Sequence, residues 1–158
     1  MTLATRPVGP ADLELICRHR EEMFRAANAP ERSDNSLRTM TAAFREWLAP
    51  RLRDGRYFGL IAEDDGTPVA GIGLMLIDWP PHPSHPQEDK RGYVLNVFVE
   101  PSHRKRGLAE VLMKLGEAEL ARRGASFAIL HATRMGRPLY EKIGWAQTSE
   151  MSKQLSET

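Results

Sequence analysis

The chain has 158 residues and a formal net charge of +1 at pH 7. This length suits one domain that buries about two thirds of its unfolded surface, so we expect a single domain over residues 1–158. The near-neutral charge argues against a broad surface for nucleic acid. Apolar runs stay below the ~20 residues of a membrane-spanning helix, so we expect neither a nucleic-acid nor a membrane partner.

Composition places the chain among globular proteins, because 41% of its residues are hydrophobic and 27% are charged. Cys17 is the only cysteine, which excludes an internal disulfide and favours a reducing compartment. Residues 1–7 lack the apolar core of a signal peptide. These features together predict a cytoplasmic location.

The N-terminal third predicts one short strand and two helices. Leu3–Val8 is expected to be an edge strand that ends at Gly9-Pro10. Apolar residues then recur at spacings of three and four, which predicts a helix that stops at the Asn28–Pro30 break. A second helix is predicted over Leu37–Arg53. The expected buried positions are Leu13, Ile16, Cys17, Met23, Phe24 and Ala27 in the first helix and Met40, Phe44, Trp47 and Leu48 in the second.

Two strands follow, over Tyr57–Ala62 and Pro68–Ile77, and the intervening Asp-Asp-Gly-Thr is a hairpin-type turn. Gly71 and Gly73 in the second strand form a G-x-G pattern. The residues after them continue a strand and supply neither a third glycine nor a helix, which excludes a dinucleotide-binding loop.

The segment Asp78–Arg91 contains four prolines and two histidines, which predicts an extended loop near a binding site. His82 and His85 are not favoured as a metal pair, because the proline-flanked backbone does not align them and no cysteine or carboxylate cluster accompanies them. We interpret both as surface histidines and expect no metal site.

The C-terminal half predicts a strand over Gly92–Glu100, a helix over Lys105–Arg123, a strand over Ser126–Ala132 and a final strand over Glu150–Leu155, with a short helix around Tyr140. The order β-α-α-β-β-β-α-β-α-β indicates an α+β fold around a central mixed sheet. The core-facing residues expected in the long helix are Leu108, Val111, Leu112, Leu115 and Ala118.

The run from Val97 to Ala109 leads an apolar strand through a basic turn into a helix, and that geometry suits an anion. The first N–H groups of a helix have no partner within it, and their dipoles place partial positive charge there. Gly107 allows close approach of a ligand to the backbone. Arg104, Lys105 and Arg106 add full charges that suit a diphosphate.

The strand-turn-helix run and a second segment, Leu139–Trp145, together resemble the GNAT superfamily of acyl-CoA-dependent N-acyltransferases. Arg104, Gly107 and Ala109 fill the superfamily signature of Arg or Gln, two residues, Gly, one residue, then Gly or Ala. Leu139–Trp145 is similar to the superfamily's Leu-Tyr-Glu-Lys-Leu-Gly-Phe segment. The resemblance implies a twisted sheet of about six or seven strands with helices on both faces.

The resemblance also implies where acetyl-CoA binds. In the superfamily the strand before the phosphate turn splays from its neighbour, and the pantetheine arm pairs with the exposed backbone. Asn96, the polar residue in that strand, marks an irregularity, reaches the acceptor amine, or is a buried amide bonded to backbone. The implied cofactor-binding residues are Val97, Phe98, Val99, Arg104, Lys105, Arg106, Gly107, Leu108, Ala109 and Thr133.

Tyr140 occupies the superfamily's usual tyrosine position, which implies a general acid for the departing thiolate. The N–H of Val97 is the candidate donor to the thioester oxygen. The base is left open among Glu22, Glu100, His131 and a chain of waters. Cys17 is a poor candidate for a covalent relay, because it lies far from both motifs in the sequence.

The resemblance therefore implies an acetyl-CoA-dependent N-acetyltransferase that transfers directly to a primary amine, within a ternary complex, on an unidentified small molecule or peptide. A catalytically idle acyl-CoA-binding sensor or interaction module remains an alternative function. For the assembly state, a homodimer remains an alternative to a monomer. A nucleic-acid-binding role for Arg104–Arg106 is disfavoured by the balanced charge. Acceptor specificity is expected in Arg18, Arg20, Glu21, Glu22, Trp47, Trp79 and the loop from His82 to His85.

Overall fold

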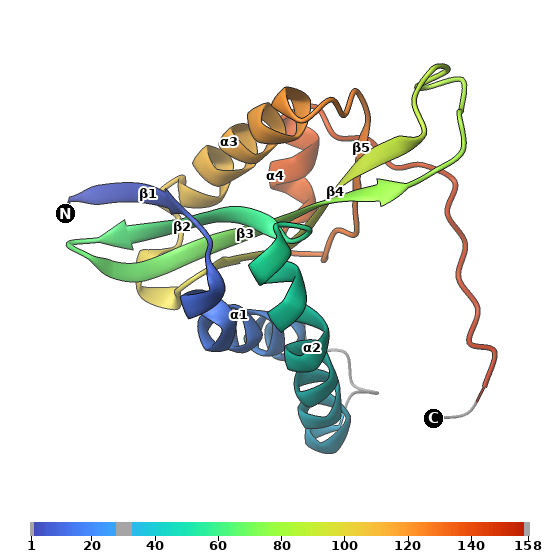
Figure 1. Cartoon of the computed structure of the whole chain (residues 1–158). Helices are drawn as coiled ribbons and strands as arrows, with labels where there is room; N and C mark the ends of the chain where they lie inside the picture. Colours follow the sequence, from blue (N-terminus) through green and yellow to red (C-terminus); the bar gives the residue numbers. More distant parts are fainter. Residues whose placement is uncertain (1, 28–32, 157–158) are drawn as a thin grey trace.

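The structure is a computed structural model that describes residues 2–27 and 33–156. Its strands form one mixed sheet in the order β1-β2-β3-β4-β5 (Figure 1). The first four strands pair antiparallel, whereas β5 runs parallel to β4. The predicted break at Asn28–Pro30 lies outside the described residues. The strands are β1 (Leu3–Pro7), β2 (Phe58–Asp64), β3 (Thr67–Asp78), β4 (Lys90–Val99) and β5 (Ala128–Leu130).

Helices cover both faces of the sheet, with α1 and α2 on one side and α3 and α4 on the other (Figure 1). Each side has its own apolar core: one cluster joins Phe44 and Leu48 of α2 to α1, and the other joins Leu112 of α3 to Ile72 and Leu74 of β3. This confirms the predicted α+β architecture. The helices are α1 (Leu13–Ala26), α2 (Asp34–Asp54), α3 (Leu108–Arg122) and α4 (Arg137–Lys142).

The strand count was overestimated, because the sheet of the described residues has five strands. The predicted strand over Glu150–Leu155 does not form, and beyond Glu150, which contacts His131, this segment runs away from the body of the molecule (Figure 1). Its two large apolar side chains, Met151 and Leu155, are 94% and 90% exposed. A strand is stabilised by a paired edge and a buried face, and this mostly polar segment has neither within the described chain.

The basic turn also ends later than predicted, because α3 begins at Leu108 rather than Lys105. Lys105 and Gly107 both adopt left-handed backbone, with φ of 62° and 79°, which an α-helix does not accommodate. Three residues of this helix that were predicted to face the core, Val111, Leu115 and Ala118, are exposed. The buried residues of α3 are Leu108, Leu112, Met113, Gly116 and Leu120.

The proline-containing loop is shorter than predicted, since β3 extends to Asp78 and β4 begins at Lys90. His82 is exposed, but the interpretation of His85 as a surface residue was wrong, because it is 1% exposed. Nε of Arg91 donates to Nε2 of His85 at 2.9 Å. His85 therefore anchors the loop to β4.

None of the helices in the described ranges is both long and apolar enough to cross a membrane.

A buried histidine predicts how stability depends on pH. His19 on α1 is 2% exposed and stacks on Phe98 of β4, with ring centroids 4.7 Å apart. Burial lowers the pKa of His19 from 6.5 to about 4, so the folded protein holds it neutral. Between these values the unfolded chain binds more protons at this residue, and stability therefore falls as the pH falls.

We expect the contribution of His19 to make the wild type about 2 kcal/mol less stable at pH 5 than at pH 7. Replacing His19→Gln removes that part of the pH dependence. Urea denaturation of both proteins at the two pH values measures the difference. Equal pH dependence in the two proteins would contradict the assignment.

Candidate active site

The strands β4 and β5 diverge in the middle of the sheet. They pair only where Gly92–Val94 lies beside Ala128–Leu130. Residues 95 to 99 of β4 continue to pair with β3 but have no partner strand on the other side within the described chain. The backbone of this half of β4 is therefore an open edge, whose N–H and C=O groups need other partners.

A β-bulge at Asn96 decides which groups face that edge. Asn96 has φ of 55°, and the register with β3 shifts between Gly71 and Gly73. The N–H of Gly92 donates to Phe127 beside β5, whereas the N–H of Glu100 donates to Val69 of β3. In a regular strand the N–H groups of Gly92 and Glu100, both even-numbered, would point to the same edge of the strand. Because they point to opposite edges, the alternation of N–H directions reverses once between them, at the bulge.

The reversal turns the amides of Val97 and Val99 toward the open edge. Consistent with this direction, Nε of Arg104 donates to the carbonyl of Val99 at 3.0 Å. Asn96 thus marks an irregularity, which was one of the alternatives that the sequence left open.

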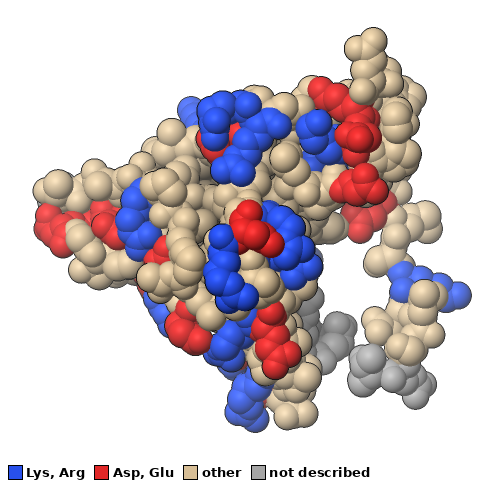
Figure 2. Space-filling model, viewed as in Figure 1, with Lys and Arg blue, Asp and Glu red and all other residues tan. Residues whose placement is uncertain are grey.

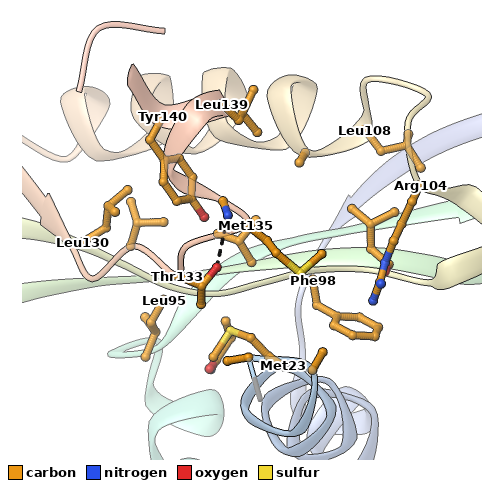
Figure 3. Close-up of a pocket in the computed structure, with 18 of the residues that line it drawn as sticks. Met23, Leu95, Phe98, Arg104, Leu108, Leu130, Thr133, Met135, Leu139 and Tyr140 are labelled. Atoms are coloured by element: carbon orange, nitrogen blue, oxygen red, sulfur yellow. Dashed lines mark hydrogen bonds between the residues drawn. The ribbon is translucent and has the colours of Figure 1, made fainter. Parts of the chain in front are cut away.

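A cleft of about 700 Å³ lies along the open edge (Figure 3). The turn and α3 border one end, α4 the other, and Met23 of α1 lies across from them. Arg106 does not line this cleft. All the other residues named as candidates for catalysis and cofactor binding do: Val97, Phe98, Val99, Arg104, Lys105, Gly107, Leu108, Ala109, Thr133 and Tyr140.

The turn before α3 has the backbone shape of an anion site. The φ angles of Arg104, Lys105 and Gly107 are −70°, 62° and 79°. Arg104 is extended, with ψ of 159°, and Lys105 and Gly107 are left-handed. A turn with left-handed residues can gather successive N–H groups into a concave site for an anion. The helix begins immediately afterwards, and its first bond runs from the N–H of Val111 to the carbonyl of Gly107. The N–H groups of the first turn before Val111 are thus left for a ligand.

At the other end of the cleft, Tyr140 projects from α4 toward the open edge (Figure 3). Thr133 supports this short helix: its hydroxyl accepts a hydrogen bond from the N–H of Gly136 at 3.1 Å, and its carbonyl accepts one from Arg137 at 3.0 Å. Burial raises the pKa of Tyr140, so the phenol stays protonated at neutral pH. Its hydroxyl has no hydrogen-bond partner among the described residues and is available as a donor.

A chain of hydrogen bonds reaches the same cleft from β5. The hydroxyl of Tyr93 lies 2.6 Å from Nδ1 of His131, and Nε2 of His131 lies 2.7 Å from a carboxylate oxygen of Glu150. With Nε2 protonated and donating to Glu150, Nδ1 is free to accept a proton from Tyr93. Burial raises the pKa of Tyr93, which favours the protonated phenol.

Of the three side chains considered as bases, only His131 lines the cleft. Glu22 and Glu100 instead form ion pairs with Arg18. Sequence reasoning missed Tyr93, because only the parallel pairing of β4 with β5 places it beside a residue that is 38 positions further along.

A second polar group lies at the bulge, on the α1 side of the sheet. Nη1 of Arg20 donates to Oδ1 of Asn96 at 2.8 Å, and Nδ2 of Asn96 donates to the hydroxyl of Tyr57 at 3.0 Å. Gly73 makes room for that hydroxyl, since a Cβ there would lie 2.0 Å from it. The Asn96 amide is therefore held by side chains rather than by backbone.

Cys17 is buried away from this site and does not line the cleft. Burial raises the pKa of its thiol, which disfavours the nucleophilic thiolate. The described residues contain no cluster of three or more His, Cys, Asp or Glu side chains that suits a metal ion.

Many charged groups on the surface of the protein are paired. On the face in Figure 2, Lys and Arg side chains lie beside Asp and Glu side chains. On α3, for example, Glu119 pairs with both Arg122 and Arg123, and Glu110 pairs with Lys114. These pairs leave no continuous basic surface on this face.

Comparisons with known proteins place the chain in a family. The sequence model of the Acetyltransferase (GNAT) family matches residues 18–145. A GCN5-related N-acetyltransferase from Ralstonia eutropha JMP134 is 57% identical, with a TM-score of 0.94 over 98% of this chain and 99% of that one. A search of curated proteins finds no match.

Two more distant structures share the fold. A predicted acetyltransferase from Clostridium acetobutylicum, with acetyl-CoA, is 22% identical, with a TM-score of 0.84 over 97% of this chain and 96% of that one. The PaiA N-acetyltransferase from Thermoplasma acidophilum, in complex with coenzyme A, is 18% identical, with a TM-score of 0.70 over 91% of this chain and 89% of that one. The chain belongs to the GNAT acetyltransferase family.

The turn predicts a stability effect that is specific to backbone conformation. Gly107→Ala is expected to destabilise the fold by about 1–2 kcal/mol, because φ is 79° and an L side chain resists that region, although space for a Cβ is available. Gly107→Asn should cost less, since Asn tolerates left-handed backbone.

Gly9→Ala is the matched control, because Gly9 has φ of −145° and equally open space. Chemical denaturation measures all three variants. A loss at Gly9 as large as that at Gly107 would refute the conformational explanation.

Proposed function

We propose that the protein is an acetyl-CoA-dependent N-acetyltransferase that transfers acetyl directly to a primary amine within a ternary complex. One observation carries the proposal: within a single cleft, the open edge of β4 runs between the left-handed turn before α3 and the hydroxyl of Tyr140, which has no hydrogen-bond partner in the described part of the chain. Such an arrangement suits an acyl-CoA, which has a diphosphate at one end, an amide-bearing arm in the middle and a thioester at the far end. We propose that residues 1–158 act as one domain in the cytoplasm.

The donor substrate fits the cleft segment by segment. The diphosphate would be held by backbone N–H groups from Lys105 to Ala109, assisted by the charge of Arg104. The amides of the pantetheine arm would pair with Val97 and Val99, as an added strand does. The related structures that contain acetyl-CoA and coenzyme A support this assignment of the ligand.

Attack of the amine on the thioester carbon places negative charge first on the carbonyl oxygen. The N–H of Val97, turned outward by the bulge, is our candidate donor to that oxygen. Collapse of the tetrahedral species expels the thiolate, which takes a proton from the hydroxyl of Tyr140. A phenol with a raised pKa is protonated at neutral pH and so is available for this step.

The acceptor must lose a proton before or during attack. We propose that the Tyr93 oxygen takes that proton while the phenol passes its own to Nδ1 of His131. Glu150 orients His131 and stabilises the imidazolium that forms. The proton then reaches solvent, because His131 is 55% exposed.

An idle acyl-CoA sensor would need the anion-binding turn and the open strand but neither Tyr140 nor the Tyr93–His131 pair. The presence of both proton-transferring groups in the cleft favours the enzyme. A nucleic-acid-binding role for Arg104–Arg106 is disfavoured by the near-neutral charge and by the paired charges of the face in Figure 2.

The first test is Tyr140→Phe, which removes only the hydroxyl. We expect turnover to fall by ~10²-fold or more, with little change in affinity for coenzyme A, because the hydroxyl acts on the leaving group. Thiol release from acetyl-CoA with a panel of amines measures the rate, and calorimetry measures binding. Equal rates would remove Tyr140 from the mechanism, and binding without turnover on any amine would favour the sensor.

The second test is His131→Gln. We expect turnover at neutral pH to fall by about 10-fold or more, with the deficit shrinking at higher pH as the free amine becomes abundant. His82→Gln serves as the control, because His82 is exposed on the loop and outside the cleft. A pH–rate profile of His131→Gln that coincides with that of the wild type would exclude the proposed proton transfer from Tyr93 to His131.

A further inference from the structure

Arg20 differs from its neighbours on α1 in having no acidic partner among the described residues. Arg18 pairs with Glu100, and Arg25 pairs with Asp34. Arg20 forms no ion pair with any described residue, and its hydrogen bond goes to the neutral amide of Asn96. Its Nε is fully buried and has no hydrogen-bond partner in the described structure. A guanidinium has five N–H donors, so most of its binding capacity is unused.

The surroundings of Arg20 hold the guanidinium rigidly but do not neutralise it. The guanidinium carbon lies 4.9 Å from the centre of the Phe24 ring and 4.8 Å from that of Phe44. Burial lowers the pKa of Arg20, yet a guanidinium remains charged at neutral pH. A partly buried charge without a counter-ion is unfavourable, and a bound anion would remove that cost.

Arg20 is also one of the residues that line the cleft. It is joined directly to the bulge, because its partner Asn96 precedes Val97, the residue whose N–H is assigned to the thioester oxygen. Arg20, Asn96 and Val97 all line the cleft, so the cation lies in the same part of the cleft as the proposed donor to the thioester oxygen.

We propose that Arg20 binds the carboxylate of the acceptor, and that the acceptor is a small amino acid whose amine and carboxylate are separated by only a few bonds. This inference rests on the proposed transferase function and names its substrate class. The planar guanidinium matches a carboxylate, with two N–H groups facing two oxygens. Asn96 and the two phenylalanine rings hold this fork in place before the acceptor arrives.

The experiment compares free amino acids with their primary amides, which have the same shape but no negative charge. Thiol release from acetyl-CoA is measured for wild type, Arg20→Gln, Arg20→Lys and Arg25→Gln. We expect wild type to prefer the acids by about 10- to 100-fold in kcat/KM, the range that charge-assisted hydrogen bonds provide. Arg20→Gln should abolish this preference with an unchanged KM for acetyl-CoA, and Arg20→Lys should retain part of it.

The control Arg25→Gln lies on the same helix but outside the cleft, and should retain the full preference. Coenzyme A binding by Arg20→Gln and Arg20→Lys establishes that the variants are folded. Equal rates on acids and amides by wild type, or an undiminished preference in Arg20→Gln, would overturn the inference and leave the transferase function intact.

A binding measurement separates this inference from the activity itself. Calorimetry of the coenzyme A-saturated protein with N-acetyl amino acids and with their amides needs no turnover. If the protein binds the acids more tightly than the amides, and Arg20→Gln loses this preference, the carboxylate site is supported even when no amine is acetylated. Absence of acetylation would then refute the transferase function alone. Indifference to the carboxylate, or no binding of either compound, would overturn the site.

Discussion

The functional architecture of this protein depends on one break in a strand. The left-handed backbone of Asn96 reverses the alternation of β4. Because β5 pairs with β4 only before that point, the reversed half of the strand has unpaired backbone groups. Unpaired amides inside a protein are costly, and a ligand that pairs with them is correspondingly favoured. The cleft, the turn proposed to bind the diphosphate and the position of Tyr140 all relate to this edge.

The bulge is itself held by a hydrogen-bonded group that spans three elements. Tyr57 after α2, Asn96 on β4 and Arg20 on α1 form a continuous chain, and Gly73 leaves room for the Tyr57 hydroxyl. Asn96, the residue at the bulge, is thus hydrogen-bonded to Arg20, the cation proposed to bind the carboxylate of the acceptor. The proposed donor and acceptor sites therefore adjoin at Asn96, which favours a fixed distance between the two substrates.

Sequence patterns predicted most of the elements because their signals are local. The turn from Arg104 to Gly107, the helix periodicities and the tyrosine segment are all contained within short windows. The exceptions have non-local causes. The Glu150–Leu155 segment has strand-like composition in part but no paired edge, and His85 is buried because Arg91 of β4 reaches it across the loop.

By itself, the amino-acid sequence determined the order of elements as far as the short helix around Tyr140, the basic turn, the family resemblance and the choice of Tyr140 as the candidate acid, since each depends on residues that are neighbours along the chain. Only the tertiary structure decided that Tyr93 lies beside His131, that Arg20 lines the cleft with no acidic partner among residues 2–27 and 33–156, and that the amide of Val97 faces outward. These three features arise from strand pairing and helix packing between residues distant in the chain, and no local pattern encodes such pairings.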